Sequence, residues 1–246
     1  GFSVQPFLAD KTLSQQGSTV RFYRTSAEGA SYLRALGGVL AARLSVAKTF
    51  APGAPLVDGS PLIPQQERLF AGGQGSVRGF QQNLLGPVVY VVSGVDTTVN
   101  DGVTVVEPKA EGLITRRAVP RGGTNLVVAN LEYRRAFRWL AEQLQFAAFV
   151  DVGNVWEGVS EPFRVANLRA TPGVGLRLMT ALGPFRIDVG YQPYAPRAGR
   201  ALYLNKGTNG GSGSIQCASP GNTVSIDPQN PGSIFDCPST YQPARG

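Results

Sequence analysis

The sequence contains no histidine, and this absence bears first on catalysis. Histidine is the usual general base, the commonest metal ligand and the usual partner of a nucleophilic serine or cysteine. Without it, an enzyme would have to rely on carboxylates, tyrosine or lysine, and no pair of carboxylates forms a recognisable site. We therefore predict no catalytic residue, no metal site and no cofactor.

Long hydrophobic runs are also missing. A transmembrane helix needs about 20 consecutive apolar residues, whereas the longest runs here are short, such as residues 146–150, and end at a charge or a glycine. The 31 glycines and 18 prolines are too many for a helical protein, and 42% hydrophobic residues are too many for a disordered chain. A membrane-spanning role would therefore require β-strands.

Clustered charge is the third feature that the chain lacks. The net charge of +7 comes mostly from arginines that are spread along the sequence, often beside apolar residues in alternating segments. Nucleic-acid binding would favour a basic cluster with aromatic residues for stacking. The spread favours a charged barrel lumen or contact with anionic lipid headgroups, and we predict no nucleic-acid partner.

Cysteine is scarce as well. Cys217 and Cys237 are the only two, twenty residues apart in a segment rich in Gly, Ser, Pro and Asn. This spacing in a loop suits a disulfide formed in an oxidising compartment. Two unrelated free thiols are the alternative.

Alternation of apolar and polar residues with period two is the main pattern that is present, and it indicates strands with two unlike faces. It is clearest where Phe185, Ile187 and Val189 alternate with Arg186 and Asp188. About seven segments are strand-like, at residues 2–8, 19–36, 40–46, 127–137, 145–156, 174–182 and 185–192.

The connections between these segments alternate in length. Those at residues 36–38, 138–142 and 182–184 are short, whereas residues 51–123 and the segment from 193 onward are long. Short turns at one end and long loops at the other are typical of outer-membrane barrels. A soluble β-sandwich also has alternating strands, but charges in mid-strand suit a wet lumen and nearly uninterrupted apolar faces suit lipid. We predict an all-β fold, a partial transmembrane antiparallel β-barrel.

The long connection contains a glycine-rich segment, ERLFAGGQGSVRGF, at residues 67–80. A phosphate-binding loop is one interpretation, but the terminal Lys-Ser/Thr and the strand-to-helix context are missing. The segment closely resembles the (V/I)RG(F/Y) signature of the BamA/TamA-like family of outer-membrane protein assembly factors. Its motif residues include Gly72, Gly73, Arg78, Gly79 and Phe80.

Three further segments continue the resemblance in the family's order, over most of residues 1–195. They are NLEYR at 130–134, FVDVGNVW at 149–156, and a hairpin with GVGLR at 173–177 and LGPFRID at 182–188. The hairpin motif contains Gly175, Arg177, Gly183 and Pro184.

The resemblance implies that the loop at residues 51–123 folds back into the barrel lumen. At the tip formed by Arg78, Gly79 and Phe80, the arginine would contact acids on the inner wall, which correspond to Glu132 and Asp151. Alternation independently puts both acids on the polar faces of adjacent strands, and a buried arginine requires a paired acid. We predict a structural contact of these residues, although a solvated lumen charge is the alternative for each acid alone.

The resemblance also sets the expected organisation. Residues 1–195 would form roughly the ninth to fifteenth of about sixteen strands, and residues 196–246 an extracellular loop pinned by Cys217 and Cys237. The family's periplasmic repeat domains and its closing last strand have no counterpart in the sequence. Residues 1–4 lack the features of a signal peptide, so we expect a missing amino-terminal portion.

The implied function is the assembly, insertion or translocation of proteins at the bacterial outer membrane, without catalysis. Expected partners are the outer-membrane lipid bilayer, unfolded outer-membrane protein clients and, through the missing domains, periplasmic or lipoprotein partners. Three alternatives stay open: a two-partner-secretion-type translocator, a barrel fused to an upstream lipase-like domain, and a passive pore. The first two depend on what precedes Gly1, and a passive pore would not need the loop motif.

Overall fold

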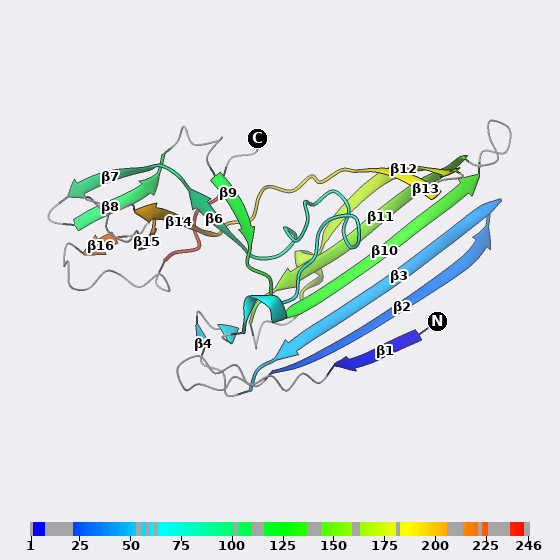
Figure 1. The fold of residues 1–246 in the computed structure, drawn as a ribbon, viewed down its shortest axis with the longest axis horizontal. Coiled ribbons are helices and arrows are strands. Elements are labelled where there is room, and N and C mark those ends of the chain that lie inside the picture. The colour runs from blue at the N-terminus through cyan, green and yellow to red at the C-terminus, as the bar shows by residue number, and fades with distance from the viewer. Residues whose placement is uncertain are drawn as a thin grey trace. The chain divides into compact units, whose positions relative to one another are not determined.

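The computed structural model divides the chain into two compact units, which are described separately (Figure 1). Unit 1 contains residues 1–86 and 122–194, and unit 2 contains residues 87–121 and 195–246. The structure describes residues 2–7, 22–52, 56–57, 60–61, 63–100, 103–109, 116–136, 144–158, 163–180, 183–205, 214–220, 223–225 and 237–243.

Strands and loops make up nearly all of these residues, so the predicted all-β fold is confirmed. The helical segments within the described ranges are the single 3-10 turns η1 (Gln65–Glu67) and η3 (Val165–Asn167). Neither is long and apolar enough to cross a bilayer.

Unit 1 is built on a seven-stranded antiparallel sheet in which spatial order follows chain order. The sheet is open, with β1 and β13 at its edges. Its members are β1 (Phe2–Phe7), β2 (Tyr23–Ala35), β3 (Gly38–Phe50), β10 (Asn125–Ala136), β11 (Leu144–Trp156), β12 (Arg169–Thr180) and β13 (Gly183–Gly190). All seven predicted segments have a counterpart here, and the predicted short connection at 138–142 lies outside the described residues.

The turn between β2 and β3 shows how the sequence sets one hairpin. Leu36 and Gly37 both have positive φ, 51° and 74°. Two such residues form the tight turn that matches the twist of antiparallel strands, and glycine adopts this backbone at little cost. The turn fixes the register, with Ala35 opposite Gly38.

The two faces of the sheet differ as the alternation predicts. One face exposes Val150, Val174 and Ile187, the last with 68% of its surface accessible. On the other face, Glu132 and Asp151 are buried, at 5% and 0% accessible. Exposed aliphatic residues and buried acids reverse the usual pattern of a water-soluble protein, and outer-membrane barrels carry their apolar residues outward in this way.

The buried polar face is covered by the loop between β3 and β10. This loop carries the short pair β4 (Leu56–Val57) and β5 (Ser60–Pro61) and then η1. Leu69 and Gly123 exchange backbone hydrogen bonds of 2.8 and 2.9 Å, which close the base of residues 69–123. The core of unit 1 lies between the loop and β10 and β11, and its buried members are Ala71, Val77, Leu85, Val128 and Val155.

Unit 2 joins two segments that are far apart in the sequence. Its four-stranded sheet has the order β15 (Ser214–Cys217), β14 (Arg200–Asn205), β6 (Val88–Val92), β9 (Arg116–Pro120). A second, three-stranded sheet has the order β16 (Thr223–Ser225), β8 (Val103–Pro108), β7 (Val95–Asn100).

Two contacts join these segments of unit 2. β14 pairs with β6 in parallel, with Leu202 opposite Val91. β16 pairs with β8 antiparallel, with Val224 opposite Thr104. Within the carboxy-terminal segment, Cys217 and Cys237 form a disulfide with their Cα atoms 5.5 Å apart. The division therefore differs from the predicted one, because the β6–β14 pairing groups residues 87–121 with the carboxy-terminal segment.

Candidate functional site

The candidate site is the tip of the loop, where three glycines bend the backbone. Gly72, Gly73 and Gly79 have φ values of +113°, +92° and +98°, a region that disfavours residues with a Cβ. The Gly72 amide donates to Ser76 Oγ at 2.7 Å, and the Gly73 amide donates to the Phe80 carbonyl at 3.0 Å. The loop therefore folds on itself and presents Arg78.

The guanidinium of Arg78 binds three carboxylates that come from three strands. Its Nε and Nη2 donate to the two oxygens of Asp151 at 2.7 and 2.9 Å, a bidentate pair. Its Nη1 donates to Glu132 Oε2 at 2.6 Å and to Asp188 Oδ2 at 3.1 Å. The backbone amide of Arg78 also donates to Asp151 Oδ2, at 2.9 Å.

Arg78 is buried in this contact, with 6% of its surface accessible. Its Cζ lies 3.4 Å from the centroid of the Phe149 ring, which shields the charge from solvent. Burial by itself disfavours the charged form, but the hydrogen bonds to Asp151 and Glu132 outweigh it and raise the pKa of Arg78 above its ordinary value. The tip therefore carries a permanent positive charge.

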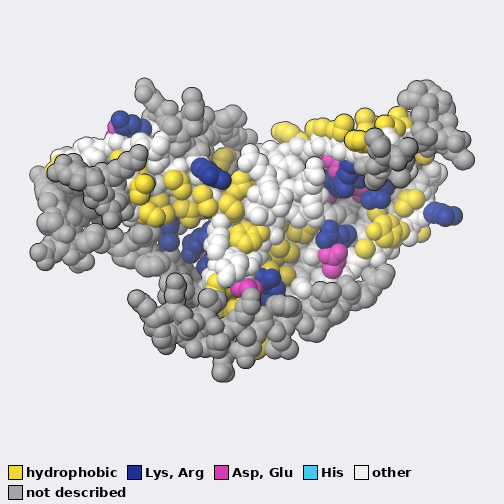
Figure 2. All heavy atoms as spheres, in the orientation of Figure 1, with side chains coloured by type: hydrophobic (Ala, Val, Ile, Leu, Met, Phe, Trp, Pro, Cys, Tyr) yellow, Lys and Arg dark blue, Asp and Glu magenta, His cyan; other side chains and the backbone are white. Residues whose placement is uncertain are grey.

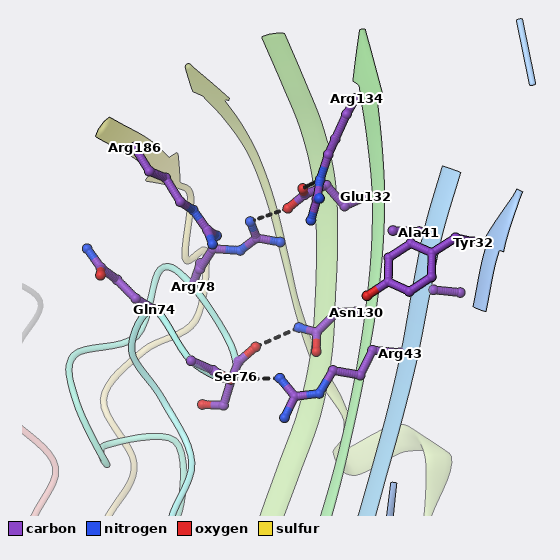
Figure 3. A pocket seen from close by; sticks show the side chains of 12 residues that line it. Tyr32, Ala41, Arg43, Gln74, Ser76, Arg78, Asn130, Glu132, Arg134 and Arg186 are labelled. Atoms are coloured by element: carbon purple, nitrogen blue, oxygen red, sulfur yellow. Dashed lines mark hydrogen bonds and ion pairs between the residues drawn. The ribbon is translucent and has the colours of Figure 1, made fainter. Parts of the chain in front are cut away.

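Hydrogen bonds to backbone carbonyls of the loop hold the tip as well (Figure 3). Asn130 donates through Nδ2 to the Ser76 carbonyl at 2.6 Å and to Asp151 Oδ1 at 2.8 Å, so it links the loop backbone to the wall acid. Arg43 of β3 donates to the Gly75 carbonyl at 3.1 Å. Two successive carbonyls of the loop are therefore held by side chains of the sheet.

Further arginines surround the wall acids. Arg134 and Arg177 both pair with Glu132 Oε1, the latter at 2.7 Å, and Arg186 pairs with Asp188. Figure 2 shows the resulting group of dark blue and magenta side chains on the face of unit 1 turned to the viewer. The arrangement offers ion pairs and hydrogen bonds for holding a loop, and no group of acids or cysteines among the described residues could hold a metal ion.

The sequence motifs in this site match a known family. Residues 3–208 match the Omp85 superfamily domain. This chain belongs to the Omp85 superfamily. The predicted resemblance to the BamA/TamA-like family is therefore confirmed.

One solved Omp85 structure is similar in fold. It is the crystal structure of BamA from Haemophilus ducreyi lacking POTRA domains 1–3, with a TM-score of 0.50 and 21% sequence identity. The match covers 74% of this chain and 34% of that one, so this chain spans about a third of the length of that structure.

Of the Omp85 motif residues singled out in the sequence, the structure brings Arg78, Glu132 and Asp151 together. Phe80 lies elsewhere: its ring stacks on Tyr194 with centroids 6.4 Å apart, beside the guanidinium of Arg169. It therefore anchors the loop near the start of β12.

The motif glycines provide room for the site. A Cβ on Gly175 would overlap the carboxylate of Asp188, and one on Gly79 would lie 3.2 Å from the side chain of Thr171. Gly183 has a φ of +126° at the start of β13. Pro184 pairs with Met179 in that hairpin, and its side chain lies outside what the structure describes.

Sequence reasoning missed three members of the site. Asp188 is a third acid, Asn130 bridges loop and wall, and Arg43 holds the Gly75 carbonyl. Alternation puts all three on the polar faces of their strands, and Asp188 is part of the LGPFRID motif. That signal gives the face of the sheet, but it does not say which of the acids there reach Arg78.

Proposed function

We propose that this chain is part of an outer-membrane β-barrel that inserts or translocates other proteins and that its mechanism contains no chemical step. The observation that supports this most is the loop tip, because Arg78 is buried against three wall acids. Removing one partner of a buried ion pair costs about 3–5 kcal/mol. A loop bound so firmly to the barrel wall would hold the wall in one position, which suits a protein that inserts or translocates other proteins.

The proposed surroundings are the outer-membrane lipid bilayer. The exposed face of β10 to β13 supports this, because Leu131, Val174 and Ile187 on it are apolar and exposed. The acids that bind Arg78 lie on the opposite face. Proposed partners are unfolded outer-membrane protein clients, with periplasmic or lipoprotein partners bound through other parts of the complete protein.

In the proposed mechanism, the contact of Arg78 fixes the loop against β10, β11 and β13. The polar side of the sheet then has one defined arrangement while a client strand pairs with a free strand edge elsewhere in the complete barrel. Unpaired strand edges pair readily with added strands, so such templating requires no catalytic residue.

The test uses the complete protein that contains this chain, reconstituted in lipid vesicles. An unfolded β-barrel client is added, and its insertion is followed by protection from protease and by heat-modifiable migration on gels. We expect Arg78→Glu to slow insertion more than about tenfold, because the tip would then face three carboxylates. The matched control is Arg117→Glu, an exposed arginine of β9. Insertion at the wild-type rate with Arg78→Glu would contradict the proposal.

A charge exchange separates contact from general damage. Combining Arg78→Glu with Asp151→Arg re-forms one ion pair of the tip, so we expect insertion to recover in part. The same vesicles distinguish the alternatives. Conductance without client insertion would favour a passive pore. Export of one dedicated partner would favour a secretion-type translocator, and ester hydrolysis by the complete protein would favour a fused lipase-like domain.

A further inference from the structure

The three acids that bind Arg78 differ in their other partners. Asp151 receives three hydrogen bonds from Arg78, counting the backbone amide, and one from Asn130. Within the described part of the chain, no other cationic side chain pairs with it. Its carboxylate is fully buried, and if the tip moved away it would lose its only positive partner among the described residues.

Glu132 is in a different position. Its Oε2 binds Arg78, while its Oε1 is already paired with Arg134 and with Arg177. Asp188 is similar, because its Oδ2 is shared between Arg78 and Arg186. Both acids would keep a guanidinium if the loop tip left the wall.

Arg177 also has unused donors. Its Nη1 and Nη2 are buried and have no hydrogen-bond partner among the described residues, although Nη2 lies 2.7 Å from Glu132 Oε1. Buried donors without partners are unfavourable. They would gain partners if the Glu132 oxygen that Arg78 occupies became free.

We infer that Arg134, Arg177 and Arg186 are positioning residues that make the loop contact releasable. They compete with Arg78 for Glu132 and Asp188 while the loop is docked, and they neutralise both acids when it is not. Asp151 then provides most of the docking strength, and the wall arginines reduce it. This inference rests on the proposed function in one respect only, namely the purpose that release of the loop would serve.

The experiment measures undocking directly. Val77 is fully buried in the core between the loop and the sheet, so a cysteine there reacts with a maleimide only when the loop has left. Cys217 and Cys237 are joined in a disulfide and do not react. The Val77→Cys variant of the complete protein, with any free cysteine outside this chain replaced by serine, is labelled in lipid vesicles.

We expect Arg134→Gln, and separately Arg186→Gln, to slow labelling at least about threefold, the scale of a partly exposed ion pair. Each change removes a competitor of Arg78. In the undocked state, Arg134→Gln leaves Glu132 with Arg177 alone, and Arg186→Gln leaves Asp188 without its paired arginine. The matched control is Arg43→Gln, which removes a donor to the Gly75 carbonyl, and it should speed labelling. Asp151→Asn should speed it most.

The direction in which each variant changes the labelling rate tests the inference. If Arg134→Gln and Arg186→Gln speed labelling as Arg43→Gln does, the wall arginines simply support the fold and the inference is wrong. Heat-modifiable migration shows independently whether each variant is folded. Client insertion is measured on the same samples. If Arg134→Gln and Arg186→Gln slow labelling but Arg78→Glu leaves insertion unchanged, this inference holds and the proposed function is wrong. If Arg78→Glu slows insertion but the two glutamine variants speed labelling, the proposed function holds and this inference is wrong.

Discussion

Asp151 and Asp188 both bind Arg78, yet their surroundings predict unequal importance. We expect Asp151→Asn to lower the free energy of unfolding by about 3–5 kcal/mol, because the new amide would face the buried guanidinium and its bidentate partner would be lost. Asp188→Asn leaves Arg78 its two other acids and should cost about 1 kcal/mol. Urea unfolding in lipid vesicles, followed by tryptophan fluorescence, measures both. Equal losses would show that the acids share the charge evenly.

The shape of the Arg78 guanidinium, and not only its charge, should matter for the loop contact. Arg78→Lys keeps the charge but cannot form the bidentate pair with Asp151 together with contacts to Glu132 and Asp188. We expect client insertion between that of the wild type and that of Arg78→Glu, measured in the vesicle assay above. Full activity of the lysine variant would mean that charge alone holds the loop.

At the scale of elements, the loop offers a matched pair of glycines. Gly79 has a φ of +98°, and an added Cβ would lie 3.2 Å from Thr171, so Gly79→Ala should destabilise the docked loop by about 1–2 kcal/mol. Gly75 lies in the same loop with no atom within 4 Å of an added Cβ, and Gly75→Ala should change little. Maleimide labelling of Val77→Cys compares the two. Similar rates for both variants would mean that the bend at Gly79 does not limit docking.

Alternation in the sequence was enough to predict the strands of the large sheet and the faces of Glu132 and Asp151. It did not identify Asp188 as a third partner, because that contact depends on register. Asp188 lies opposite Gly175, and the absence of a side chain there gives its carboxylate room. Pairing between distant strands is a tertiary property that local patterns do not contain.

The strands of unit 2 were read as parts of loops for the same reason. Residues 88–92 and 200–205 are short, and their parallel pairing joins segments more than a hundred residues apart. Nothing in either segment marks the other as its neighbour. The cysteines were visible in the sequence, but the sheet that their disulfide adjoins was not.

For the whole molecule, the exposed apolar face gives a test of the membrane assignment. We expect Ile187→Arg to reduce refolding into lipid vesicles strongly, since an arginine facing lipid near the bilayer centre costs about 2–4 kcal/mol. Ser45→Arg puts the same charge on the polar face of β3 and serves as the control. The refolded fraction is scored by heat-modifiable migration. Equal refolding of the two variants would argue against lipid contact at Ile187.

The division into units predicts a local effect of the disulfide. Replacing Cys217 and Cys237 by serine removes a cross-link that closes about 20 residues, worth about 3 kcal/mol in small loops. We expect faster trypsin cleavage within residues 195–246 and unchanged labelling of Val77→Cys, because the loop core belongs to unit 1. Faster labelling as well would mean that the two units are energetically coupled.

The parallel pairing of β6 with β14 also has a consequence for the order of events during biogenesis. The β6 segment leaves the ribosome more than a hundred residues before its partner, whereas the hairpins of the large sheet pair strands made in succession. Contacts between distant segments form slowly, since a long stretch of chain must first be closed. Unit 2 is therefore expected to mature after the hairpins of the large sheet, and an assembly intermediate captured early would contain these hairpins while residues 87–121 are not yet paired with β14.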